Sequence, residues 1–230
     1  MHALRQSTVE RPSPVERLVV MARWPAPGRC KSRLAAGCGA ERAAWIQERL
    51  TSHTLQSAVA SCASPQRELR LAVEGLGRRG LGRWQRALAH QGLALEAAPQ
   101  GAGNLGCRMQ RELRLAFAAG REAVVLVGTD LPSLEPADLA LAFAALQEQP
   151  CVIGPASDGG YWLLGLRRDG FALAGAALMG GMPWGSDQVL QATLQAAQRR
   201  QLPVQLLREQ SDLDQIGDLA AWLRCGPLLS

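Results

Sequence analysis

Short apolar runs alternate with helical patterns along this chain, and this alternation constrains the fold more than any other feature. The strand-like runs are RLVVMA (17–22), ELRLAV (68–73), LALEAA (93–98), AVVLVG (123–128), CVIGPA (151–156), YWLLGL (161–166) and PVQLL (203–207). Helices are predicted over 40–61, 106–119, 135–148, 186–200 and 216–224, with a short one before 93. Ser186 is the expected N-cap of the helix over 186–200, and no helix is predicted in the glycine-rich stretch before it.

This order of elements predicts an α/β fold: a three-layer α/β/α sandwich around a mostly parallel sheet. The short link between 151–156 and 161–166 predicts one antiparallel pair, so the sheet should be mixed. A chain of 230 residues with 47% hydrophobic content is long enough for one sizeable core. We therefore expect a single domain over 16–230, preceded by a flexible polar leader over 1–15.

Several features bear on location and partners. No apolar run approaches the roughly 18 residues that a membrane span needs, and the N-terminus lacks the apolar core of a signal peptide. The six cysteines include no CxxC pair, which favours reduced thiols in the cytoplasm. The net charge of +5 would suit a nucleic-acid or polyphosphate binder, but the basic groups lack interleaved aromatics. We expect solvated arginine faces and no nucleic-acid partner.

Lys31 is the only lysine among 25 basic residues, and it lies in the loop RWPAPGRCKSRL (23–34) directly after the first strand. Prolines stiffen this loop, Gly28 lets its backbone turn closely, and Lys31 and Arg33 stand near a helix start. Exposed N–H groups and cations at such a point form a site for a diphosphate. The spacing is not that of a Walker A loop. The alternative is a basic surface turn.

A glycine-rich loop, PQGAGNLG, follows the third strand-like run. Gly101, Gly103 and Gly106 fit GxGxxG, but a dinucleotide fingerprint also needs an acidic residue at the end of the next strand. Glu122 has about the right separation and precedes its strand instead, at the wrong edge of the sheet. We therefore expect a loop that contacts a nucleotide in another way.

Carboxylates follow three other strands. Asp130 follows a buried strand directly and could ligate a divalent cation that bridges phosphates, or cap the next helix, although Ser133 could take that role. Asp158 lies beside Gly159 and Gly160, in a turn that either leaves space for a substrate or is only a hairpin turn.

Two more features complete the candidate set. Asp214 could be a second metal ligand or a charged cap of the last helix. Trp184 could stack on a sugar or a base, or belong to the core. The three histidines fall outside these loops and no nucleophile elbow is present, which argues against a Ser-His-Asp enzyme.

Five motifs in order carry a family resemblance: MARWPAPGRCKSRL, PQGAGNLGCRM, VLVGTDLPSL, GPASDGGYWLLGL and GMPWGSDQVL. Together they resemble a bacterial family of uncharacterised glycosyltransferase-A-like (GT-A-like) proteins, some of them assigned to arsenosugar biosynthesis. At the level of the fold this family is similar to molybdenum cofactor guanylyltransferase and phospholactate guanylyltransferase. The resemblance covers about residues 16–222.

This resemblance implies a nucleotide-diphospho-sugar transferase fold and a divalent cation, Mg²⁺ or Mn²⁺. Lys31 and Arg33 match the family's opening motif, while Arg23 stands where a lysine is usual. Asn104 replaces the aspartate of a G-D-L-G motif. In the closing D-x-D-T-P-E-D-L motif, Asp212, Asp214, Asp218 and Leu219 match, but QIG replaces TPE.

The leading hypothesis is sugar transfer from a nucleoside-diphosphate-sugar donor to a small-molecule acceptor. Catalytic roles fall to Asp158 and Lys31, and the metal would be held by Asp130 and Asp214. The donor nucleotide would contact Ala22, Arg23, Pro27, Gly28, Lys31, Arg33, Gln100, Gly101, Gly103 and Asn104. The acceptor side would comprise Gly159, Gly160, Tyr161 and Trp184. The alternatives are nucleotidyl transfer from an NTP with release of pyrophosphate, and a catalytically silent nucleotide-binding protein.

Overall fold

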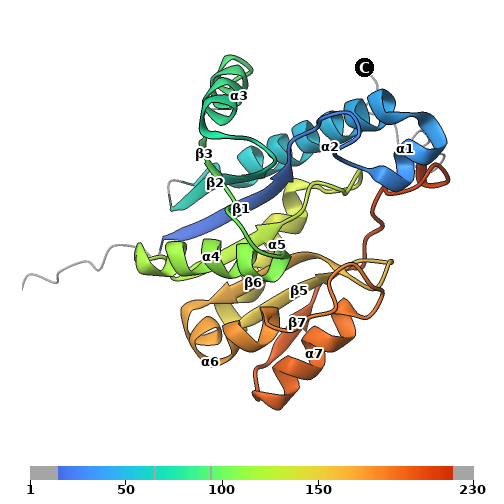
Figure 1. Cartoon of the computed structure of the whole chain (residues 1–230). Coiled ribbons are helices and arrows are strands. Elements are labelled where there is room, and N and C mark those ends of the chain that lie inside the picture. Colours follow the sequence, from blue (N-terminus) through green and yellow to red (C-terminus); the bar gives the residue numbers. More distant parts are fainter. Residues whose placement is uncertain (1–14, 65, 94, 220–230) are drawn as a thin grey trace, which may run out of the picture.

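The computed structural model describes residues 15–64, 66–93 and 95–219 (Figure 1). The strands are β1 (Glu16–Arg23), β2 (Arg67–Glu74), β3 (Glu96–Pro99), β4 (Ala123–Val127), β5 (Cys151–Pro155), β6 (Tyr161–Arg167) and β7 (Val204–Leu206). The helices are α1 (Ser32–Cys38), α2 (Ala40–Ser61), α3 (Arg78–His90), α4 (Leu105–Ala118), α5 (Pro136–Glu148), α6 (Arg168–Met179) and α7 (Val189–Arg199). The predicted leader falls almost entirely on residues 1–14, outside the described residues.

The seven strands form one sheet in the order β3-β2-β1-β4-β6-β5-β7. Only β6 runs antiparallel to its neighbours, β4 and β5, so the predicted mixed sheet is confirmed. β1 lies at the centre of the parallel part and pairs with both β2 and β4. The carboxyl ends of the six parallel strands, and the start of β6, therefore meet at one edge of the sheet.

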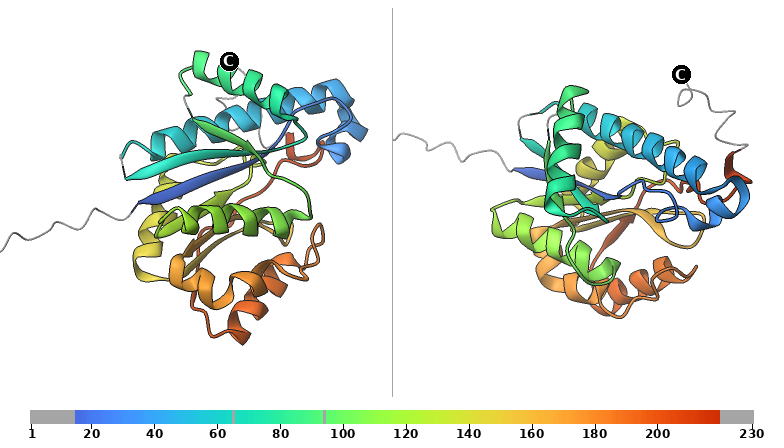
Figure 2. Two further views of the ribbon diagram at one scale, coloured as in Figure 1. Left: turned by 60° about the vertical axis from the view of Figure 1, so that its left-hand side comes forward. Right: turned by 45° about the horizontal axis from the view of Figure 1, so that its top comes forward.

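Helices cover both faces of the sheet, as the two views of Figure 2 show. One apolar core lies between the sheet and α2, α3 and α5, with Leu18, Leu55 and Phe143 among its buried members. A second core lies on the other face, against α4, α6 and α7, and includes Val19, Leu113 and Leu178. Successive β1 residues thus enter opposite cores, as the alternating side chains of a strand require. The predicted single-domain, three-layer architecture is confirmed.

Three element predictions need correction. The glycine-rich stretch after β6, in which no helix was predicted, forms the helix α6. Ser186 is not the cap of α7, because that helix begins at Val189 with Gln188 at its N-cap; the Ser186 hydroxyl instead accepts the Gln188 N–H. The third strand begins at Glu96, later than expected.

Two further points concern the ends of the fold. Of the helix predicted over 216–224, only its start near Asp218 lies within the described residues. None of the helices in the described part of the chain is long and apolar enough to cross a bilayer.

Candidate functional site

Four loops meet at the carboxyl edge of the sheet and bring Lys31 and several aspartates together. The loop after β7 is tied to its neighbours by backbone hydrogen bonds: Leu213 donates to the Asp130 carbonyl at 2.9 Å, and Ser157 donates to the Gln210 carbonyl at 3.0 Å. The loops after β4, β5 and β7 are therefore fixed side by side, although they lie up to about 80 positions apart in the sequence.

Lys31 lies at the centre of this group. Its side chain is only 3% exposed, and its ammonium Nζ lies 2.6 Å from Asp130 Oδ1 and 3.1 Å from Asp214 Oδ1. It also donates to the Leu213 carbonyl at 2.7 Å, so all three of its N–H bonds have an acceptor. Burial alone would lower the pKa of Lys31, but the two carboxylates outweigh burial and raise it. The ammonium is therefore charged at neutral pH.

The backbone at Lys31 is unusual. This residue is the N-cap of α1. Its backbone has φ 48° and ψ 51°, in the left-handed region that residues other than glycine rarely adopt. Such a conformation costs about 1–3 kcal/mol and persists only where surrounding contacts hold it. The three contacts of the ammonium supply that restraint.

Arg33 adds a second cation at the rim. Its guanidinium lies 3.6 Å from Asp214 Oδ2, and its side chain is mostly exposed. Asp214 thus lies between a buried ammonium and an exposed guanidinium. Asp218 accepts the N–H groups of Asp214 and Gln215. The helix that Asp214 was expected to cap lies mostly outside the described residues, so that alternative stays a prediction.

Asp212 is a member of the site to which the sequence analysis gave no role. Its Oδ1 is buried and has no hydrogen-bond partner among the described residues. Burial, and then the nearby charges of Asp130 and Asp158, raise its pKa to about 7. The D-x-D spacing was the signal that could have found it, because alternate residues of an extended segment share a face.

The donor set partly fits a divalent cation. Asp130 Oδ1 and Asp214 Oδ1 lie close together, since both contact the Lys31 ammonium, and the unpaired buried oxygen of Asp212 lacks the partner that such groups normally have. No three acidic, histidine or cysteine side chains in the described ranges stand together as a complete set of metal ligands. This suits Mg²⁺ or Mn²⁺, which commonly takes one or two carboxylates and completes its shell with water and phosphate oxygens. Asp130 does not cap α5, whose N-cap is Glu135.

The glycine-rich loop lies beside the end of β1. The Gln100 amide is buried and donates to the carbonyls of Ala22 and Ala72, both at 3.1 Å, which fastens the loop to β1 and β2. Gly101 and Gly103 have φ values of 78° and 108°, and a Cβ on Gly103 would crowd Cys107. This loop is therefore held against β1 and β2, and its glycines leave the backbone exposed at the edge of the site.

Asn104 has a structural role in this loop. It is the N-cap of α4, and its side-chain oxygen accepts the Cys107 N–H at 3.0 Å. The substitution relative to the family motif therefore preserves a helix cap.

Arg23, the last residue of β1, is paired with an acidic side chain of the neighbouring strand. Glu74, at the end of β2, holds Arg23 at 3.0 Å with one oxygen and Arg108 at 2.6 Å with the other. Glu74 and Arg108 were not anticipated from the sequence. Pro27 and Gly28 are exposed, and Gly28 has φ 71° with open space around it, as the predicted close turn requires.

Asp158 lies in an exposed turn on the other side of the cluster formed by Lys31 and the aspartates. Its Oδ1 accepts the Gly160 N–H at 2.9 Å, and the Gly159 carbonyl accepts the Leu190 N–H at 2.9 Å. A Cβ on Gly159, which has φ 86°, would overlap the Asp187 backbone, so only glycine fits there. The turn is thus an ordinary hairpin turn by its hydrogen bonds, and it also places a carboxylate near Asp212.

Tyr161 and Trp184 pack against one another in a T-shaped pair with centroids 6.3 Å apart. Both rings flank the second core, and burial raises the pKa of the Tyr161 hydroxyl above its usual range. The Trp184 indole lies against Gly106, at the start of α4, where a Cβ would be too close to it. Their contacts are those of packing side chains, and a role toward an acceptor stays a prediction.

The fold and the site together define a class: an α/β protein with a nucleotide-diphospho-sugar transferase-like fold. The crystal structure titled "putative nucleotide-diphospho-sugar transferase from Desulfovibrio desulfuricans G20" superposes with a TM-score of 0.79 at 29% identity, over 91% of this chain and 87% of that one. The chain itself belongs to a family described as uncharacterized protein conserved in bacteria (DUF2064), whose model matches residues 54–186. No protein with a curated description matches the chain.

More distant structures share the fold. The synthetase for CMP:2-keto-3-deoxy-manno-octonic acid, complexed with CTP, has a TM-score of 0.56 at 12% identity over 92% of this chain and 97% of that one. Rv0371c from Mycobacterium tuberculosis H37Rv, complexed with manganese, has a TM-score of 0.50 at 16% identity over 93% and 100%. At these identities the likeness shows the fold alone.

Proposed function

We propose that this protein is a metal-dependent glycosyltransferase that moves a sugar from a nucleoside-diphosphate-sugar donor to a small-molecule acceptor. The observation that carries the proposal is the buried ammonium of Lys31, held between Asp130 and Asp214 at the edge where the strands end. Cations placed where a diphosphate leaving group develops charge lower the barrier to its departure. Arg33, at the rim, adds a second positive charge for the same group.

The donor nucleotide would lie over the end of β1 and the glycine-rich loop. On the first of these, its contacts would come from Ala22, Arg23, Pro27 and Gly28. On the second, they would come from Gln100, Gly101, Gly103 and Asn104. The hydrogen bonds from Gln100 to β1 and β2 support this placement, because they hold the two loops at a fixed separation. A preformed site of this kind loses less entropy when a ligand binds.

Asp130 and Asp214 would hold Mg²⁺ or Mn²⁺ in this proposal, and water and phosphate oxygens would complete its shell. A bound cation supplies positive charge against the oxygens of the diphosphate. The relatives solved with CTP and with manganese are consistent with this combination of ligands. With these carboxylates bound to the cation, the Lys31 ammonium would donate hydrogen bonds to the phosphate oxygens.

Asp158 would face the acceptor. In the transfer, the bond between the anomeric carbon and the diphosphate oxygen breaks, and the nucleoside diphosphate leaves with the electron pair. The acceptor oxygen bonds to the anomeric carbon and gives its proton to the Asp158 carboxylate, which is exposed in its turn and so open to a substrate. Gly159 and Gly160 leave room beside it, with Tyr161 and Trp184 behind.

Nucleotidyl transfer is the second candidate, considered because a structure that shares the fold is complexed with CTP. It would use the same phosphate loop and carboxylates, consume an NTP and release pyrophosphate. A silent nucleotide-binding protein is the third candidate. The arsenosugar assignment and the cytoplasmic location also stay predictions.

Product analysis separates these candidates. The purified protein is incubated with Mn²⁺ and a panel of nucleotide sugars and NTPs. Sugar transfer predicts release of UDP, GDP or a related diphosphate, and the Asp158→Asn variant should slow this about a hundredfold or more while leaving nucleotide binding intact. Pyrophosphate from an NTP would favour the second candidate, and binding without turnover of any donor would favour the third.

A further inference from the structure

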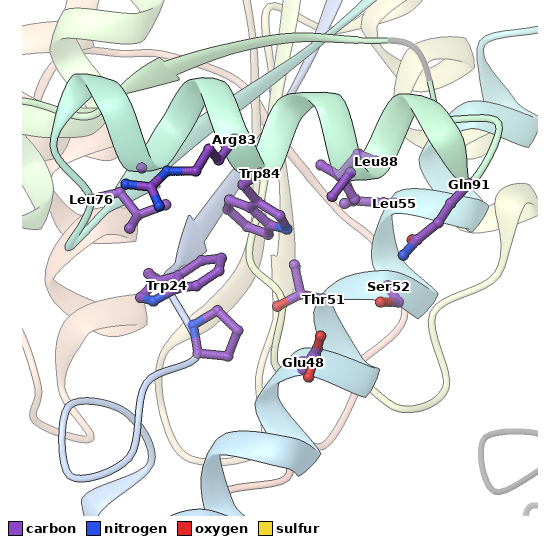
Figure 3. A pocket seen from close by; sticks show the side chains of 13 residues that line it. Trp24, Glu48, Thr51, Ser52, Leu55, Leu76, Arg83, Trp84, Leu88 and Gln91 are labelled. Carbon is purple, nitrogen blue, oxygen red and sulfur yellow. The ribbon is translucent and has the colours of Figure 1, made fainter.

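A cavity of about 410 Å³ lies between α2 and α3, next to the proposed donor site and outside it (Figure 3). The residues that line it are Trp24, Pro25, Glu48, Thr51, Ser52, Leu55, Leu76, Gly80, Arg83, Trp84, Ala87, Leu88 and Gln91. None of these residues has a role in the proposed transfer. The pocket is open to solvent on one side, and pockets of this size with a mostly apolar lining are typical of small-molecule sites.

The walls of the cavity are two facing helix stripes. Glu48, Thr51, Ser52 and Leu55 share one face of α2 at helical spacing. The opposite wall is the stripe of α3 that begins at Gly80, together with the C-cap residue Gln91. Trp24, just after β1, and Trp84, on α3, form a T-shaped pair at the cavity, with centroids 5.0 Å apart and an interplanar angle of 74°. Figure 3 shows both indoles facing the space that Glu48, Thr51 and Ser52 border from below.

Charge at the cavity favours a cationic ligand. Glu48 is exposed and forms no hydrogen bond or ion pair with any described residue, so its carboxylate can pair with a cation in the pocket. The negative faces of the two indoles also attract cations. Arg83 brings the opposite charge, but its guanidinium lies beside Leu76, toward the end of the cavity (Figure 3).

We propose that this cavity is a second ligand site, for a small aromatic amine. The ring packs against Trp24 and Trp84, and the ammonium pairs with Glu48, with the Ser52 hydroxyl as a further acceptor. The inference goes beyond the proposed transfer and does not depend on it.

Residues that line the cavity are also connected to Lys31 and Asp130 of the proposed donor site. Trp24 and Pro25 begin the loop that ends at Lys31. The Thr51 hydroxyl lies 3.4 Å from the Gln47 amide, which also donates at 3.0 Å to Thr129, next to Asp130. An occupant would therefore contact the structural support of the donor site without entering it.

Calorimetry on the full chain, without nucleotide or metal, tests the proposal. The probes are 2-phenylethylamine and 3-phenylpropionate, which have similar shapes and opposite charges. We expect the amine to bind at least about tenfold more tightly, as one charge-assisted contact allows. The Glu48→Gln variant should lose this preference, whereas Glu41→Gln, on the same helix and away from the cavity, should keep it.

A second variant tests the location. Ala87→Phe, on the exposed side of the α3 wall, should fill the cavity and abolish amine binding, and Ala89→Phe, which does not line it, should have no effect. Equal affinity for the two probes, preference for the carboxylate, no saturable binding of the amine, or unchanged binding in Ala87→Phe would each overturn the proposal. None of these outcomes would bear on the donor site, because no nucleotide is present.

Discussion

Lys31 combines features that a surface lysine does not show: a left-handed backbone, a nearly buried side chain and three acceptors around one ammonium. A guanidinium is broad and planar, so it cannot meet three acceptors that converge on one nitrogen. The position therefore selects a compact cation, which accounts for a lysine here in a chain that otherwise uses arginine.

The Lys31→Arg variant should bind GDP and UDP about ten- to a hundredfold more weakly than the wild type. Arginine keeps the positive charge, but its planar guanidinium cannot make the hydrogen bonds that the compact ammonium makes. Calorimetry with Mn²⁺ present measures this. Arg42→Lys, an exposed change on α2, is the matched control. Unchanged nucleotide affinity in Lys31→Arg would restore the alternative of a basic surface turn.

The sequence could predict some of these residues and not others. Lys31 and Asp130 stood out because each lies in a loop that follows the end of a strand, which places it at the ligand-binding edge, and Lys31 is also the only lysine. Asp212 could not be assigned in the same way, since its distinguishing property is an oxygen left buried and unpaired by the folded loops around it. Glu74 was missed because a glutamate ending an amphipathic strand looks like any exposed charge.

At the scale of the element, α4 shows how a loop residue can serve two purposes. Asn104 caps this helix, and the loop before it forms the rim of the proposed nucleotide site. An aspartate can cap as well as an asparagine, so either residue would serve the helix at this position.

The capping role of Asn104 can be tested by thermal unfolding, independently of any nucleotide binding. Asn104→Ala should destabilise the protein by about 1 kcal/mol, which lowers the Tm by about 2–4 °C in a chain of this size. Asn104→Asp should retain the wild-type Tm, as thermal unfolding can show. Equal losses in both variants would mean that something other than the cap makes the asparagine necessary.

The element predictions failed where tertiary contacts overrode local preference. The stretch that forms α6 contains Gly170 and Gly175, which argue against a helix when taken alone. A Cβ on Gly170 would overlap the Pro150 carbonyl, and one on Gly175 would overlap the Phe171 ring, so close packing requires glycine at both positions. The continuous apolar strands were predictable because burial on both faces leaves no other pattern.

At the scale of the whole molecule, strand order decides which loops meet. The alternation of elements predicted the layers, but the placement of β4 beside β1 and of β7 beside β5 is a property of the assembled sheet. That order brings the loops bearing Lys31, Asp130 and Asp214 together from three distant parts of the chain. The proposed function depends on this meeting, and on a cation being held there.

Calorimetric titration of GDP and UDP into the wild type and the Asp130→Asn variant, each with and without Mn²⁺, tests that claim most directly. Asp169→Asn, an exposed change beside Arg167 at the opposite edge of the sheet, serves as the control. We expect Mn²⁺ to strengthen nucleotide binding at least about tenfold in the wild type and the control, and to have no effect in Asp130→Asn. An equal Mn²⁺ enhancement in Asp130→Asn would contradict the account.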